Sequence, residues 1–124
     1  MQEAELEYAY NPDRFLRGGY LTELFDGINF STVSGDSEVL AGINVILTSG
    51  HTPGHQSVVV DATDSKYRKK YVYCGDESPL EENLQRRNIT GILFNQKKSL
   101  EAIDRLRDID AVFIYSHDRT QMEI

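Results

Sequence analysis

The sequence predicts a mixed α/β fold, and three features of the chain carry that prediction. Short apolar runs bounded by turn residues are typical of strands, and they occur at 43–48, 56–61, 71–74 and 111–115. Residues 98–108 instead place Leu100, Ile103 and Leu106 on one helical face, with charged residues elsewhere. At 124 residues and 40% apolar composition, the chain is large enough for one core or for part of a larger domain.

The N-terminal third predicts one helix followed by short irregular pieces. Residues 2–10 (QEAELEYAY) contain helix formers and few breakers, and Asn11-Pro12-Asp13 ends that helix. Residues 13–28 are ambiguous, and Gly18-Gly19 divides them into two short pieces. Turns between short strands are expected at 35–36 and 41–42.

The middle of the chain predicts three strands around one unusual turn. The strand at 43–48 leads directly into Ser49–Ser57 (SGHTPGHQS), which carries two of the three histidines. After the next strand, the basic cluster Lys66–Lys70 (KYRKK) is interpreted as a solvated hairpin turn rather than as a binding surface. Further along, Pro79 is expected in the first turn of a helix, because proline is tolerated there.

Composition limits the kinds of partner and compartment. The net charge of −7 argues against a nucleic-acid surface. No run approaches the roughly 18 to 20 apolar residues that a membrane span needs, and the polar, acidic N-terminus does not resemble a secretory signal. The single cysteine, Cys74, excludes an internal disulfide and is interpreted as a small buried strand residue. We therefore expect a cytoplasmic protein.

Three predicted strands lead to groups that can bind a metal ion. His51 follows the strand at 43–48, Asp76 follows the strand at 71–74, and His117 follows the strand at 111–115. Strand ends at one edge of a sheet are where α/β folds gather functional groups, and imidazoles with a carboxylate suit zinc or another divalent metal. A lone histidine or aspartate at a strand end is more often a turn-stabilising residue, so only the set of three indicates a site.

Three motifs, in this order, resemble the metallo-β-lactamase superfamily: SGHTPGHQSVVV, YVYCGDE and FIYSHD. Within that superfamily the chain is most similar to the N-acyl-homoserine lactonase-like branch, from about residue 4 to residue 118. The resemblance implies an α/β fold forming one lobe of the superfamily's αβ/βα sandwich, with a mixed sheet and flanking helices. It also implies a metal-dependent hydrolase that opens a lactone or similar ester by means of a metal-bound hydroxide.

The resemblance also implies a role for each residue of the site. His51 matches a ligand of one metal ion, His117 a ligand of a second, and Asp76 the catalytic carboxylate that bridges the two. His55 matches a residue that orients the turn at Ser49–Ser57, here called the histidine turn, without binding metal. Two readings of Asp118 stay open: it braces His117, or it is a solvated turn residue. Two zinc ions are expected in the complete family site, and other divalent metals are possible.

The chain departs from the family pattern in what it lacks. The His-x-His-x-Asp-His motif of the superfamily is absent, and no histidine precedes His51. Residues 1–124 are therefore interpreted as the C-terminal part of a metallo-β-lactamase-like domain, a fragment in which each ion has two protein ligands. The alternative is a non-catalytic truncated or split half that binds a partner chain. A single-metal site using His51, Asp76 and His117 together is a further alternative.

Two more departures concern partners. Half of a sandwich exposes an inner apolar face, for which the candidates are Val58, Val60, Val72 and Phe113. Such a face favours a homodimer or a complementing N-terminal half.

The lactonases of this family carry a tyrosine three residues after the bridging aspartate, where this chain has Pro79. The expected substrate is thus a small lactone or ester whose identity stays open.

Overall fold

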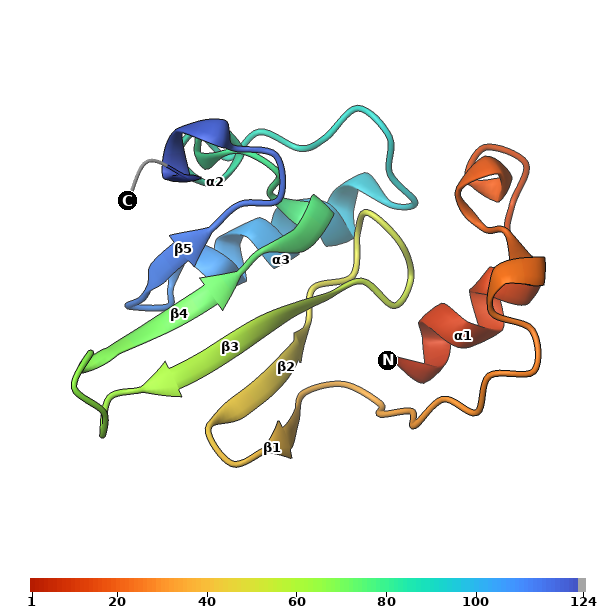
Figure 1. Cartoon of the computed structure of the whole chain (residues 1–124). Coiled ribbons are helices and arrows are strands. Elements are labelled where there is room, and N and C mark those ends of the chain that lie inside the picture. The colour runs from red at the N-terminus through yellow and green to blue at the C-terminus, as the bar shows by residue number, and fades with distance from the viewer. Residues whose placement is uncertain (123–124) are drawn as a thin grey trace.

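The computed structural model describes residues 1–122 as one mixed five-stranded sheet with helices beside it (Figure 1). The strands, in spatial order, are β1 (Ser37–Leu40), β2 (Ile43–Leu47), β3 (Gln56–Ala62), β4 (Lys69–Tyr73) and β5 (Val112–Ile114). The helices are α1 (Glu3–Tyr10), α2 (Glu81–Arg86) and α3 (Gln96–Arg107). The ambiguous segment 13–28 contains two short 3₁₀ turns, Arg17–Gly19 and Thr22–Leu24.

The sheet topology brings the ends of three strands to one edge. β1 to β4 pair in antiparallel order, and β5 then pairs parallel to β4. β2, β4 and β5 therefore run in the same direction, and their carboxyl ends meet at one edge of the sheet. The chain segments that follow these strands carry His51, Asp76 and His117, as the sequence predicts.

The hydrophobic core lies between one face of the sheet and the helices α2 and α3 (Figure 1). Its buried residues are Val72, Cys74, Leu84, Ile103, Leu106 and Tyr115. The helical spacing of Ile103 and Leu106 places both fully inside this core. At the start of α3 the Asn95 side chain accepts a hydrogen bond from the backbone N–H of Lys98, which caps the helix. The capped helix α3 thus packs against the sheet through Ile103 and Leu106.

None of the helices within residues 1–122 covers the opposite face of the sheet (Figure 1). The register places side chains of β3, β4 and β5 next to one another on this face, which for brevity we call the open face: Val58, Val60, Tyr71, Tyr73, Val112 and Ile114. Four of them are among the exposed large apolar residues, namely Val60, Tyr73, Val112 and Ile114. The assignment of Val58 and Val60 to an open face agrees with this register.

The assignment of Val72 and Phe113 to that face is wrong. Val72 is 0% exposed and Phe113 packs against the core cluster, because both alternate with the open-face residues and point towards α3. Two smaller expectations also need correction. Lys69 and Lys70 begin β4 instead of forming the hairpin turn, and Pro79 precedes α2, whose N-terminal boundary is Leu80.

The helix α1 lies beside the turn that joins β2 and β3 (Figure 1). Its position is held by Gln2, a buried residue whose side chain bonds both backbone groups of Gly35 and the side chain of Gln56. None of the helices between residues 1 and 122 is long and apolar enough to cross a membrane.

Candidate metal centre

His51 is held in place by three hydrogen bonds from different parts of the chain. Its backbone N–H donates to a Glu77 carboxylate oxygen at 2.8 Å, and its carbonyl accepts from the N–H of Phe94. The ring Nδ1 lies 2.9 Å from the carbonyl oxygen of Ile92. A carbonyl can only accept, so Nδ1 carries the hydrogen and Nε2 keeps a free lone pair. That tautomer is the one that an Nε2-bound metal ion requires.

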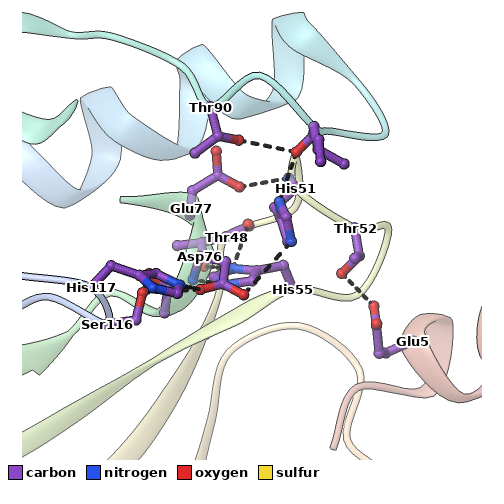
Figure 2. A network of polar contacts seen from close by, with 12 residues as sticks. Glu5, Thr48, His51, Thr52, His55, Asp76, Glu77, Thr90, Ser116 and His117 are labelled. Carbon is purple, nitrogen blue, oxygen red and sulfur yellow. Dashed lines mark hydrogen bonds and ion pairs between the residues drawn. The ribbon is translucent and has the colours of Figure 1, made fainter. Parts of the chain in front are cut away.

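Asp76 lies between two imidazole rings (Figure 2). Its Oδ2 is 3.8 Å from His51 Nε2, and its Oδ1 is 3.3 Å from His117 Nε2. The hydroxyl of Ser116 donates to Oδ1 at 2.9 Å and also contacts the carbonyl of Gly75. The two oxygens of one carboxylate therefore face two different histidines, an arrangement suited to a bridging ligand.

His117 follows β5 and is the more exposed of the two histidines that face Asp76. Its side chain is 68% exposed, against 23% for His51. Its backbone N–H donates to the carbonyl of Pro79 at 3.0 Å, which ties the segment after β5 to the segment after β4. The exposed ring can turn to meet an incoming group, whereas His51 is already oriented.

His55 has both ring nitrogens occupied by groups of the chain. The backbone N–H of Asp76 donates to Nε2 at 3.1 Å. Nδ1 then carries the hydrogen and lies 2.9 Å from Thr48 Oγ1 and 3.1 Å from the Thr48 carbonyl. Burial lowers the pKa of His55, and the nearby His51 lowers it further. A neutral His55 thus links Thr48 to the backbone of Asp76, consistent with an orienting role.

Asp118 makes local turn contacts. Its Oδ1 accepts hydrogen bonds from the N–H and the hydroxyl of Thr120, and these bonds lower the pKa of the carboxyl. The described hydrogen bonds of Asp118 do not include His117. Of the two readings of Asp118 that the sequence leaves open, the geometry favours the turn residue.

The donor groups fit divalent ions, but no complete site is present among residues 1–122. Two ligands at about 2.0–2.2 Å from a tetrahedral ion lie roughly 3.3–3.6 Å apart. The 3.3 Å between His117 Nε2 and Asp76 Oδ1 falls in this range, and the 3.8 Å between His51 Nε2 and Asp76 Oδ2 is slightly longer. Among these residues, no group of three or more His, Cys, Asp and Glu side chains converges in a way that could hold one ion. The alternative of one metal held by all three residues therefore lacks support.

Sequence reasoning missed two carboxylates that hold the histidine turn. Glu5 of α1 accepts hydrogen bonds from Thr52 Oγ1 at 2.6 Å, from the Gly54 N–H at 3.0 Å and from the Tyr20 hydroxyl at 2.6 Å. Glu77 is fully buried and accepts from His51 N–H and from the Ser99 hydroxyl. Burial raises the pKa of Glu77. Both contacts span long stretches of sequence, so no local pattern indicates them.

Two pockets adjoin the site and share His51, Asp76 and Ile92. The larger, of about 650 Å³, also reaches the apolar side chains of Phe15 and Leu16. The smaller, of about 290 Å³, contains His117 and Pro79. Cys74 is buried in the core, as the sequence predicts, although it lies directly after β4 rather than within it. Burial raises the pKa of its thiol to about 12, which disfavours the reactive thiolate.

Known proteins resemble this chain in sequence. The chain is 29% identical over 125 residues to an N-acyl homoserine lactonase of a Bacillus species, which covers 98% of this chain and 47% of the relative. It is 28% identical over 130 residues to the N-acyl homoserine lactonase AttM of Rhizobium radiobacter, covering 95% and 48%. The chain is similar to the N-acyl homoserine lactonases over nearly its whole length. It spans about half the length of the lactonases it matches, and no protein-family model matches it.

Solved structures confirm the α/β fold with a mixed sheet and flanking helices. A hydrolase of N-acyl homoserine lactones, with the product N-hexanoyl-L-homoserine at its catalytic metal centre, matches with a TM-score of 0.82 at 25% identity. That match covers 98% of this chain and 47% of the lactonase. A probable metal-dependent hydrolase from Staphylococcus aureus matches with a TM-score of 0.70 at 18% identity, over 85% of this chain and 37% of that one, and supports the fold alone.

Proposed function

We propose that this chain is the C-terminal part of a metallo-β-lactamase-like domain and supplies half of a two-metal hydrolytic site. One observation carries the proposal: the two oxygens of Asp76 face the Nε2 atoms of His51 and His117. The similarity to lactonases over 98% of the chain supports the same conclusion. The reaction class is hydrolysis of a lactone or a similar ester.

Each residue has a distinct task in this proposal. His51 and His117 each offer an imidazole nitrogen to one ion, and Asp76 holds one oxygen towards each. Divalent ions, such as zinc, would supply a water of lowered pKa and polarise the ester carbonyl. His55 holds the backbone of Asp76 by accepting its N–H, and Ser116 holds Oδ1. The chain's own groups thus fix the carboxylate from two sides.

The pockets support a small ester substrate. Ile92, Phe15 and Leu16 give the larger pocket an apolar wall beside His51 and Asp76, which suits a ligand with a hydrocarbon part. In the smaller pocket Pro79 presents no hydroxyl to a carbonyl group. Recognition of the lactone therefore differs here from that in relatives with a tyrosine at this position.

Zinc content and lactone hydrolysis, measured on the same preparation, test this function. We expect zinc to bind weakly, because each ion has two ligands from this chain where catalytic zinc usually has three. We expect Asp76→Ala to abolish what binding there is. Hydrolysis of an N-acyl homoserine lactone is expected to be slow or absent until further ligands are supplied. Equal zinc content in the wild type and in Asp76→Ala would contradict the proposal.

A second candidate function is a non-catalytic half that binds a partner chain. The observation that favours it is the open face, which leaves Val60, Tyr73 and Ile114 exposed. The partner is then a second copy of this chain or a complementing half. Sedimentation of the wild type beside Tyr73→Lys separates the two functions: a dimer that the substitution dissociates, with no bound zinc, supports the partner-binding half.

A further inference from the structure

Glu77 is a buried carboxylate that bonds the histidine turn but is not one of the proposed metal ligands. Its side chain is 0% exposed, although it follows directly after Asp76 in the chain. Burying a carboxylate is costly unless hydrogen bonds compensate the lost water. A fully buried carboxylate is therefore expected to accept hydrogen bonds that fix the position of neighbouring segments.

The groups bonded to Glu77 come from two other elements of the fold. One oxygen accepts the backbone N–H of His51 at 2.8 Å (Figure 2). The other accepts the hydroxyl of Ser99, near the start of α3. Gly50 packs so closely here that a side chain on it would collide with the Ser99 backbone and with Glu77. The histidine turn, the segment after β4 and α3 thus meet at Glu77.

We propose that Glu77 is a positioning residue that sets the separation between His51 and Asp76. The proposal rests on the proposed metal centre. Glu77 is the residue next to Asp76 in the chain, and its side chain bonds the backbone N–H of His51, 26 residues away. It therefore joins the two segments that carry these proposed ligands. Ser99 prevents the Glu77 side chain from turning away, because it bonds the second oxygen. Glu77 therefore acts on a metal ion through His51, without touching it.

The same geometry predicts that the two histidines respond differently to changes at Glu77. His117 is held by other groups, since its N–H donates to Pro79 and its neighbour Ser116 bonds Asp76. Loss of Glu77 should therefore disturb His51 and leave His117 in place. A residue that merely supports the core would affect both histidines alike.

The test compares Glu77→Ala and Glu77→Gln with wild type by nitrogen NMR of the imidazole rings, before and during zinc titration. Glutamine keeps an acceptor for His51 N–H and can donate to the Ser99 oxygen, so we expect near wild-type behaviour. For Glu77→Ala we expect a mixed tautomer at His51 and about tenfold weaker zinc binding there, as is typical for residues that orient a metal ligand. Glu7→Ala, on the exposed face of α1, is the control.

Three outcomes overturn the proposal: an unchanged His51 in Glu77→Ala, equal changes at His51 and His117, or a Glu77→Gln protein that behaves like Glu77→Ala. If Glu77→Ala does not fold, Ser99→Ala takes its place. It removes one hydrogen bond, and about threefold weaker binding at His51 is expected, with no change there as the contrary result. If the wild type binds no zinc, the proposed function fails, whereas the tautomer comparison still tests Glu77.

Discussion

Glu5 and Thr52 are joined by a 2.6 Å hydrogen bond that ties α1 to the histidine turn. The same carboxylate accepts the N–H of Gly54 and the hydroxyl of Tyr20. One side chain from the first helix thus bonds the turn on a different side from Glu77 (Figure 2). The segment that carries His51 is therefore bonded by two carboxylates from different elements.

Replacing Glu5 should loosen α1 and the turn together. We expect Glu5→Ala to lower the free energy of unfolding by about 1–3 kcal/mol, because three donors lose a charged acceptor at a partly buried position. Urea denaturation measures this effect, and Glu7→Ala on the exposed side of the same helix is the matched control. Equal losses in the two variants would show that the contacts of Glu5 contribute nothing.

Gly54 is the closest point of approach between the turn and α1. A Cβ at this position would overlap the backbone nitrogen and the side chain of Glu5. We expect Gly54→Ala to cost about 1–3 kcal/mol through overpacking, a fall in Tm of about 5 °C or more. Gly91→Ala adds the same methyl group where no heavy atom lies within 4 Å. A thermal melt in which both variants match the wild type would contradict the prediction.

The proposed ligands predict a graded loss of metal. His51→Ala, Asp76→Ala and His117→Ala should each lower the zinc bound per chain, because each removes a group facing the proposed ions. His55→Ala should lower it less, since both His55 nitrogens are bonded within the chain. Elemental analysis after dialysis, with circular dichroism to confirm folding, measures the difference. Equal zinc in all four variants would rule out this assignment.

The ion pair between Asp36 and Arg105 predicts a pH dependence of stability. The Arg105 guanidinium bonds the carboxylate and lowers the pKa of Asp36 below its usual value of 3.8. Because the folded-state pKa is depressed, the contribution is full above about pH 4 and is lost as pH falls through the folded-state pKa. Both side chains are nearly half exposed, so solvent screening limits the effect to about 0.5 kcal/mol.

Urea denaturation of Arg105→Leu at pH 7 and near pH 2.5 tests this pH dependence. The variant should be less stable than wild type at pH 7, and the difference should shrink in acid as Asp36 becomes protonated. Arg107→Leu, an exposed position in the same helical turn, corrects for loss of a positive charge. A constant difference at both pH values would mean that the ion pair does not contribute.

Local patterns predicted most of the fold, because they depend on neighbouring residues alone. The spacing of Ile103 and Leu106 identified α3, and the apolar runs identified four of the five strands. The runs Tyr71–Cys74 and Val112–Ile114 are apolar at every position, however, so their alternation does not reveal which side chains face α3. The faces of Val72 and Phe113 therefore follow only from the strand register, which the sequence does not contain.

The sequence predicts the proposed metal ligands, which follow strand ends. It does not predict the residues that hold those ligands by hydrogen bonds from distant parts of the chain. His51, Asp76 and His117 each follow a strand, and the direction of those strands brings them together. Glu77 was passed over because its partners, His51 and Ser99, are distant in sequence. Glu5 is likewise an ordinary surface glutamate of a helix until the turn packs against it. Such supporting contacts arise from tertiary approach.

The parallel pairing of β5 with β4 also bears on the order in which the site assembles. β1 to β4 are joined by short turns, whereas the three registered pairs of β5 with β4 close a loop that contains α2 and α3. Because strand pairing across a long loop is slow, we expect His117 to reach the site last during folding and β5 to open first in the native protein. A metal ion bound by both Asp76 and His117 would then stabilise β5 against local opening. Amide hydrogen exchange of Val112–Ile114 should slow when zinc is added, and exchange within β2 and β3 should not.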